Sequence, residues 1–184
     1  GGFILATALE RSGAHRRIAL YMVRAFGGNS SRRLVFGFMC ASAFLSMWIS
    51  NTSTTLMLLP VALAALEKSD DPSLASPLLL GIAYAASIGG IGTPIGTPPN
   101  MVFMGVYSEV TGGAISFGQW MLWAIPVVLL LLPIAGLWIT RGVPKSGGVA
   151  LPASEAWSTA ERRVLTVFSI TAVLWMTRKG PWGG

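Results

Sequence analysis

A cluster of small polar side chains lies in the middle of an apolar, uncharged stretch of the chain. From Ser46 to Thr55 the sequence reads Ser-Met-Trp-Ile-Ser-Asn-Thr-Ser-Thr-Thr, and no charged residue occurs between Leu34 and Leu66. Hydroxyl and amide oxygens, together with backbone carbonyls released where a helix breaks, suit a hard monovalent cation such as Na⁺. The N–H groups at the beginning of the following helix suit an anion, because the positive end of the helix dipole lies there.

A second interruption follows in the next apolar segment. Residues 89–100 read Gly-Gly-Ile-Gly-Thr-Pro-Ile-Gly-Thr-Pro-Pro-Asn, with four glycines and three prolines, and no charge occurs between Pro72 and Ser108. Such a sequence cannot continue a regular helix. A hydrophobic segment broken by glycine and proline is typical of the binding site of a membrane transporter.

Each feature alone has a simpler explanation, since Ser/Thr clusters often join packed membrane helices and Gly/Pro breaks often produce only kinks. The two together, each inside an uncharged run, favour a binding site. Neither break contains Asp, Glu, Lys or Arg. A neutral site can hold a dianion only if a cation supplies the charge, so the pattern predicts Na⁺ coupling and disfavours a carboxylate proton relay.

The composition predicts a membrane protein. Of the 184 residues, 53% are hydrophobic and 11% charged, whereas a soluble domain has about 25% charged residues. The net charge of +6 comes from basic residues at the ends of apolar runs, where they act as topology markers. We therefore expect lipid as a partner and no nucleic-acid binding.

The elements expected along the chain are all α-helical. The segments are a broken helix on the scaffold side (1–31), a re-entrant hairpin (32–68), a discontinuous helix (74–107), a transmembrane helix (117–140), a cytoplasmic linker (141–163) and the start of another helix (164–184). Each half of the hairpin is about 12–15 residues, too short to cross a bilayer alone. Ser158 and Glu161 have the spacing of a capping box, and Trp120, Trp123 and Trp138 fit interfacial aromatic belts.

The basic residues favour re-entry of the hairpin over a full crossing. Re-entry places residues 11–33, Lys68 and residues 141–163 on one side, opposite the loop 108–116, which has no Lys or Arg. The basic side is then cytoplasmic. A full crossing would separate the basic residues at positions 32 and 33 from those after 140. We also expect a re-entrant tip to be reachable from water at Thr54.

Ser50-Asn51-Thr52 with the upstream Ser46, and the stretch from Ser87 to Asn100, resemble the motifs of the divalent anion/sodium symporter family. This family includes the sodium-coupled di- and tricarboxylate and sulfate carriers. The resemblance runs from Gly1 into the last helix and corresponds to the first of two inverted repeats. It implies half of an elevator-type transporter, a multi-pass protein of the inner membrane that is a homodimer when full length. It also implies a carrier rather than an enzyme, with Na⁺ as coupling ion and no organic cofactor.

Residue roles follow from the same resemblance. Ser46, Ser50 and Asn51 would bind Na⁺, completed by the backbone of Gly96, while Asn51 and Thr52 would contact a carboxylate of the substrate. Weaker candidates for Na⁺ are Gly92, Thr97 and Asn100. Pro98 departs from some members, which carry glycine there, and this difference can change which carbonyl reaches the ion. A second Ser-Asn-Thr motif and a second Na⁺ site would belong to the other repeat.

Three alternatives remain open at this point. One is a sodium-independent anion exchanger on the same scaffold. Another is an exporter of the arsenite type within the wider ion-transporter class. The last is a structural membrane subunit in which the polar clusters serve only helix packing.

Overall fold

A computed structural model of the chain describes residues 2–27, 30–69, 71–144 and 158–177. Within these ranges every regular element is a helix, as the sequence predicts. In chain order the elements are α1 (Gly2–Ser12), α2 (Ala14–Gly27), α3 (Ser31–Ser46), α4 (Asn51–Leu66), the short 3₁₀ helix η1 (Pro72–Leu74), α5 (Ala75–Gly90), α6 (Pro98–Thr111), α7 (Phe117–Ile139) and α8 (Thr159–Thr177). Most of the expected linker (145–157) and the end of the expected last helix (178–184) lie outside the described residues.

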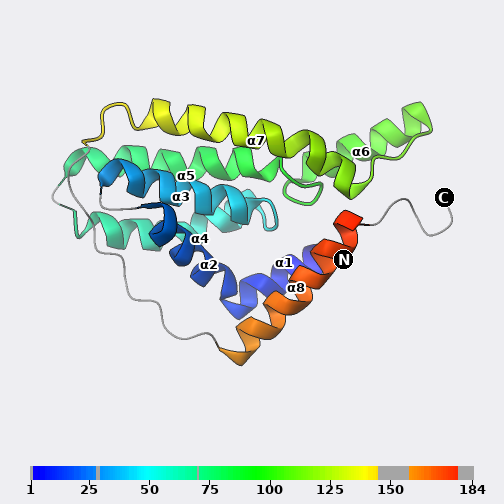
Figure 1. Cartoon of the computed structure of the whole chain (residues 1–184), viewed down its shortest axis with the longest axis horizontal. Coiled ribbons are helices and arrows are strands. Elements are labelled where there is room, and N and C mark those ends of the chain that lie inside the picture. Colours follow the sequence, from blue (N-terminus) through cyan, green and yellow to red (C-terminus); the bar gives the residue numbers. More distant parts are fainter. Residues whose placement is uncertain (1, 28–29, 70, 145–157, 178–184) are drawn as a thin grey trace.

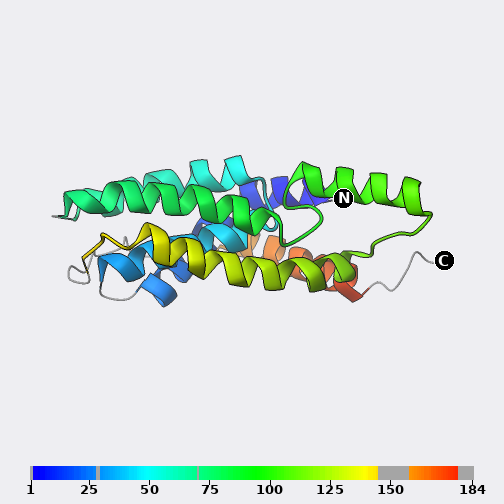
Figure 2. The same ribbon diagram turned by 90° about the horizontal axis from the view of Figure 1, so that it is seen from above.

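Helices α3 and α4 form a hairpin, not one straight rod. The turn between them spans residues 47–50, so the polar cluster lies at the tip. The start of α3 and the end of α4 lie at the same end of the molecule (Figures 1 and 2). Ser30 caps α3 by accepting a hydrogen bond from the N–H of Arg33 (3.3 Å), and Ser50 caps α4 by accepting one from Ser53 (3.1 Å). Such side-chain caps satisfy N–H groups that have no partner within the helix.

The glycine- and proline-rich stretch separates α5 from α6. Helix α5 ends at Gly90, and α6 begins at Pro98, with two prolines at positions where a helix tolerates them. Helix α6 projects beyond the other helices, and α7 returns alongside α5 (Figure 1). Of the described residues, two helical stretches are long and apolar enough to cross a membrane, Pro72–Gly90 and Phe117–Ile139.

Helix α3 is the centre of the packing and lies against both α2 and α5. Its large side chains Phe38 and Met39 are fully buried. Near its end, α3 approaches α5 so closely that a methyl group on Gly89 would lie 2.1 Å from the carbonyl oxygen of Ala43. Small residues permit this kind of contact between membrane helices. The contact brings the hairpin tip beside the end of α5.

Basic residues at the start of α3 and after α7 make contacts at the end opposite the tip. The guanidinium of Arg32 donates to the hydroxyl of Thr140 (2.9 Å), which joins the start of α3 to the end of α7. The guanidinium of Arg141 stacks on Trp138, 3.3 Å from the ring centroid. The end of α4, which Lys68 follows by two positions, lies at the same end as the start of α3, and the loop between α6 and α7 lies at the other (Figure 1). Re-entry of this hairpin into a membrane from the basic side stays a prediction.

Helices α1 and α8 lie side by side, and α2 leads from them to α3, against which it packs (Figure 1). The break between α1 and α2 falls at Gly13, whose φ of +75° is a left-handed conformation that glycine adopts readily.

Helix α8 begins within the expected linker because the capping box is formed. The N–H of Ser158 donates to the carboxylate of Glu161 (2.7 Å), and the N–H of Glu161 donates to the hydroxyl of Ser158 (3.2 Å). The same carboxylate accepts a hydrogen bond from Arg17 and so joins α8 to α2.

The ion pair between α2 and α8 predicts an acid-sensitive contact. The backbone N–H of Ser158, and to a smaller extent Arg17, hold the pKa of Glu161 below its ordinary value. A lowered pKa means that the carboxylate stabilises the fold above about pH 4.5, its ordinary value, and that this contribution is lost as the pH falls through the folded-state pKa. Glu161→Gln should therefore lower the thermal unfolding temperature of the detergent-solubilised full-length protein at neutral pH, and this loss should shrink as the pH falls below about 4.5. Glu109→Gln, a substitution at an exposed position of α6, should leave the unfolding temperature unchanged over the same pH range. A decrease as large as that of Glu161→Gln would contradict the assignment.

Candidate ion and substrate site

The two breaks meet in space. The hydroxyl of Thr93, in the loop after α5, donates to the carbonyl oxygen of Met47 in the hairpin tip. A methyl group on Gly92 would lie 2.9 Å from the end of the Met47 side chain. The turn 47–50 and the loop 91–97 therefore form one unit, although more than forty residues separate Met47 from Thr93.

Oxygen atoms from both breaks converge at this junction. The hydroxyl of Ser46 donates to the amide oxygen of Asn51 over 2.5 Å, and a methyl group on Gly90 would lie 2.5 Å from the same amide oxygen. A methyl group on Gly96 would lie 2.5 Å from the carbonyl oxygen of Gly90 and 3.0 Å from that of Ser46. Only glycine allows the backbone to approach so closely. The cluster thus consists of the amide oxygen of Asn51, the carbonyl oxygens of Ser46 and Gly90, and the backbone of Gly96.

Asn100 fixes the loop from the side of α6. Its buried amide nitrogen donates to the carbonyl oxygens of Gly90 and Thr93, both over 2.8 Å. A carbonyl oxygen has two lone pairs, so that of Gly90 can accept this bond and still face a cation. The amide nitrogen of Asn100 has a positioning role in this geometry, and ligation of Na⁺ by its amide oxygen stays a prediction.

The beginning of α4 is the more suitable anion site of the two helix starts. Helix α6 opens with Pro98 and Pro99, and proline has no backbone N–H to offer. Helix α4 opens with Asn51 and the exposed Thr52, which have backbone N–H groups in the first turn and polar side chains. An anion at this end would lie next to the oxygen cluster.

The site is electrically neutral in its own residues. Both breaks lie within uncharged stretches, and the described residues contain no group of three or more His, Cys, Asp or Glu that could hold a metal ion. Neutral hydroxyl, amide and carbonyl oxygens suit an alkali cation better than a transition metal. The arrangement can therefore hold a small cation beside a helix start that attracts an anion.

The remaining residues predicted for the site make other contacts in the structure. Ser50 uses its hydroxyl to cap α4, Gly92 packs against Met47, and Thr97 precedes α6 without a side-chain capping bond. The expectation that water reaches Thr54 is wrong. Thr54 is fully buried on the face of α4 that also buries Leu58, and its hydroxyl has no hydrogen-bond partner among the described residues.

Sequence reasoning missed three residues of the junction: Gly90, Thr93 and Trp120. Gly90 and Thr93 lie in the stretch that the sequence singles out, but only the fold shows which carbonyl and hydroxyl face the hairpin. The sequence places Trp120 in an interfacial belt. That prediction is untested, but the indole N–H donates to the carbonyl oxygen of Ile91 over 2.9 Å, and no local signal in the sequence indicates this contact.

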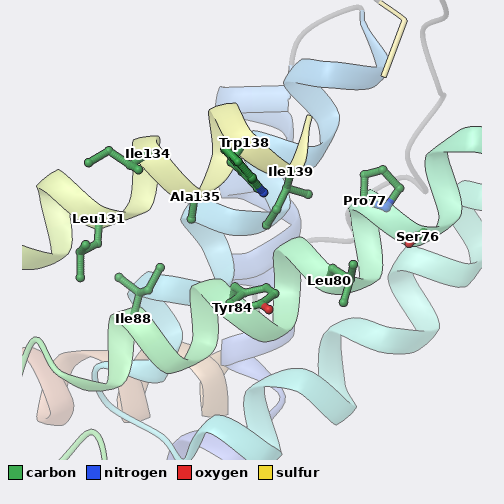
Figure 3. Close-up of a pocket in the computed structure, with 10 residues that line it drawn as sticks. All are labelled: Ser76, Pro77, Leu80, Tyr84, Ile88, Leu131, Ile134, Ala135, Trp138 and Ile139. Atoms are coloured by element: carbon green, nitrogen blue, oxygen red, sulfur yellow. The ribbon is translucent and has the colours of Figure 1, made fainter. Parts of the chain in front are cut away.

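A pocket of about 760 Å³ lies elsewhere, between α5 and α7 (Figure 3). Tyr84 and Leu80 from α5 line it opposite Trp138 and Ile139 from α7. Its lining is largely apolar and includes none of the residues predicted to bind Na⁺ or the substrate. This pocket is therefore separate from the oxygen cluster.

Apolar helices of membrane-spanning length and two helix breaks that meet at a neutral oxygen cluster are typical of membrane transport proteins. The chain belongs to the citrate transporter family, which it matches over residues 1–181. It is 35% identical over 201 aligned residues to the sodium-dependent dicarboxylate transporter SdcS of Staphylococcus aureus strain NCTC 8325, and equally similar to that of strain COL. These matches cover 97% of this chain and 38% of each relative, so the chain spans less than half the length of the curated relatives. They confirm the resemblance to the divalent anion/sodium symporters.

Proposed function

We propose that the chain forms part of a secondary active transporter that takes up a divalent anion together with Na⁺. The substrate class is C4-dicarboxylate, citrate or sulfate. The observation that carries the proposal is the convergence of the Asn51 amide oxygen with the carbonyl oxygens of Ser46 and Gly90 in neutral surroundings. Membership of a citrate transporter family and the sodium dependence in the name of the relative support it.

In this proposal Na⁺ binds to Ser46, Ser50, Asn51 and Gly96, with Gly92, Thr97 and Asn100 as further candidates. The hydroxyl of Ser46 and the amide oxygen of Asn51 already lie 2.5 Å apart. When a cation arrives, the hydroxyl hydrogen can rotate away, so that both oxygens face the ion. The close approach of Gly96 to Gly90 leaves backbone oxygens to complete the coordination.

The anion would bind at the start of α4. Asn51 can donate from its amide nitrogen and Thr52 from its hydroxyl, next to the first-turn N–H groups. Because neither break has a charged side chain, the bound cation must supply the charge that attracts a dianion. This requirement makes binding of the ion and of the substrate cooperative.

The moving unit would consist of the hairpin (32–68) and the discontinuous helix (74–107), with 1–31 on the scaffold side. Backbone contact between α3 and α5 at Gly89 supports movement of hairpin and broken helix as one body, as an elevator mechanism requires. The full-length protein would be a homodimer in the inner membrane, with the basic end in the cytoplasm and the hairpin entering from there.

The test is uptake of radiolabelled succinate, citrate or sulfate by liposomes containing the full-length natural protein, with NaCl or KCl outside. We expect uptake of at least one substrate to require Na⁺ and to saturate with its concentration. Uptake that is equal in both salts would favour the sodium-independent exchanger, and uptake of none would favour the arsenite-type exporter or the structural subunit. Either outcome would overturn the proposal.

A further inference from the structure

Trp120 contacts both halves of the broken helix. It lies in the first turn of α7 (Phe117–Ile139), and its indole N–H donates to the carbonyl oxygen of Ile91 over 2.9 Å. Its ring packs edge-to-face on Phe103 of α6, with ring centroids 5.9 Å apart and an angle of 65° between the planes. One side chain therefore joins the end of α5 to the exposed helix that follows the loop.

The carbonyl that Trp120 holds is next to the oxygen cluster. Ile91 directly follows Gly90, whose carbonyl oxygen belongs to the cluster. Two positions after Ile91, Thr93 binds the hairpin tip through its hydroxyl. A carbonyl group at the C-terminal end of a helix has no backbone N–H partner within the helix and needs a donor from outside it. The indole is that partner, and it fixes the peptide plane adjacent to the one that carries the Gly90 oxygen.

The loop needs such a restraint. Gly92 and Gly96 give it conformational freedom, and among the described residues the burial of α6 is confined to Asn100. Asn100 holds the loop from within, and Trp120 holds it from the neighbouring helix. Together these contacts set where the backbone of Gly96 faces Gly90 and Ser46.

We propose that Trp120 is a positioning residue of the sodium site. This inference rests on the proposed function. The indole fixes the angle between α5 and α6, so that the backbone oxygens of the loop are already directed toward Asn51 before Na⁺ arrives. Residues that orient the ligands of a metal ion typically change its affinity 10- to 100-fold when removed. The maximal transport rate at saturating Na⁺ needs no contribution from Trp120.

The test is Trp120→Phe in the full-length natural protein, which keeps an aromatic ring but removes the N–H donor. We expect the Na⁺ concentration for half-maximal uptake to rise about 10-fold, with the maximal rate at saturating Na⁺ close to that of the wild type. Trp123→Phe, one turn further along α7 and exposed, is the matched control and should change neither quantity. Stabilisation of the purified protein by Na⁺ against heat gives a second readout that does not depend on transport.

A second variant covers the case that Trp120→Phe does not fold. Phe103→Leu removes the ring contact from the side of α6 and should raise the half-saturating Na⁺ concentration in the same direction by a smaller factor. An unchanged Na⁺ requirement in the variants that fold, or an equal rise in Trp123→Phe, would overturn this inference alone. A wild-type protein whose uptake and heat stability are both indifferent to Na⁺ would instead overturn the proposed function, and the assignment of Trp120 with it.

Discussion

Replacement of Asn51 with alanine should reduce sodium-dependent uptake to background in the full-length protein while leaving its expression intact. The amide oxygen of Asn51 accepts the hydroxyl of Ser46 and faces the backbone of Gly90, and in the proposed mechanism the same side chain also donates to the substrate. Loss of a residue that orients a metal ligand typically costs 10- to 100-fold in affinity. Loss of a direct ligand that also contacts the substrate should cost more. Uptake of labelled substrate at several Na⁺ concentrations measures the effect.

Ser53→Ala is the matched control for this change. Ser53 lies in the same turn of α4, and its backbone N–H, which bonds to the cap residue Ser50, is kept in the variant. Alanine is also the best helix former, so this variant should fold and transport as the wild type does. If Asn51→Ala transported as well as Ser53→Ala, the polar cluster would serve only helix packing.

The positions of the helix breaks could be predicted because their causes are local. An uncharged polar segment near Ser50, between two apolar runs, predicts a hairpin. The closely spaced glycines and prolines near Gly92 exclude a regular helix. The charge pattern also predicts that the start of α3 and the segment after α7 lie on one side, and the hydrogen bond from Arg32 to Thr140 joins them. Each of these inferences needs only neighbours in sequence and the cost of charge in lipid.

The contacts across the junction could not be predicted, because they depend on which helices pack side by side. The burial of Thr54 follows from the position of α4 against its neighbours, and the bond from Trp120 to Ile91 follows from the return of α7 beside the loop. Nothing near Gly90 in the sequence distinguishes its carbonyl from that of Gly96. The sequence therefore identifies the stretch that forms the site but does not determine which of its atoms face inward.

The second large effect is expected for Gly96→Ala. The added methyl group would lie 2.5 Å from the carbonyl oxygen of Gly90 and 3.0 Å from that of Ser46, so the backbone of the loop or of the hairpin tip must move. Overpacking of this kind costs about 1–3 kcal/mol. If this whole cost opposes Na⁺ binding, the affinity for Na⁺ falls by about 5- to 150-fold. We expect the Na⁺ dependence of uptake and of heat stability to shift by a factor in this range.

Gly105→Ala separates this steric effect from a general effect of adding a methyl group. Gly105 lies inside α6, and a methyl group there would meet no heavy atom within 4 Å in the described part of the chain. Alanine inside a helix is more stable than glycine by roughly 0.5–1 kcal/mol, so this variant should keep the Na⁺ dependence of the wild type. If Gly96→Ala bound Na⁺ as tightly as Gly105→Ala does, the close approach of Gly96 to the hairpin would have no role in the ion site. The coordination would then have to be completed without the backbone of Gly96, and the carbonyl oxygen of Gly90, at the end of α5, is the next candidate because it already belongs to the cluster.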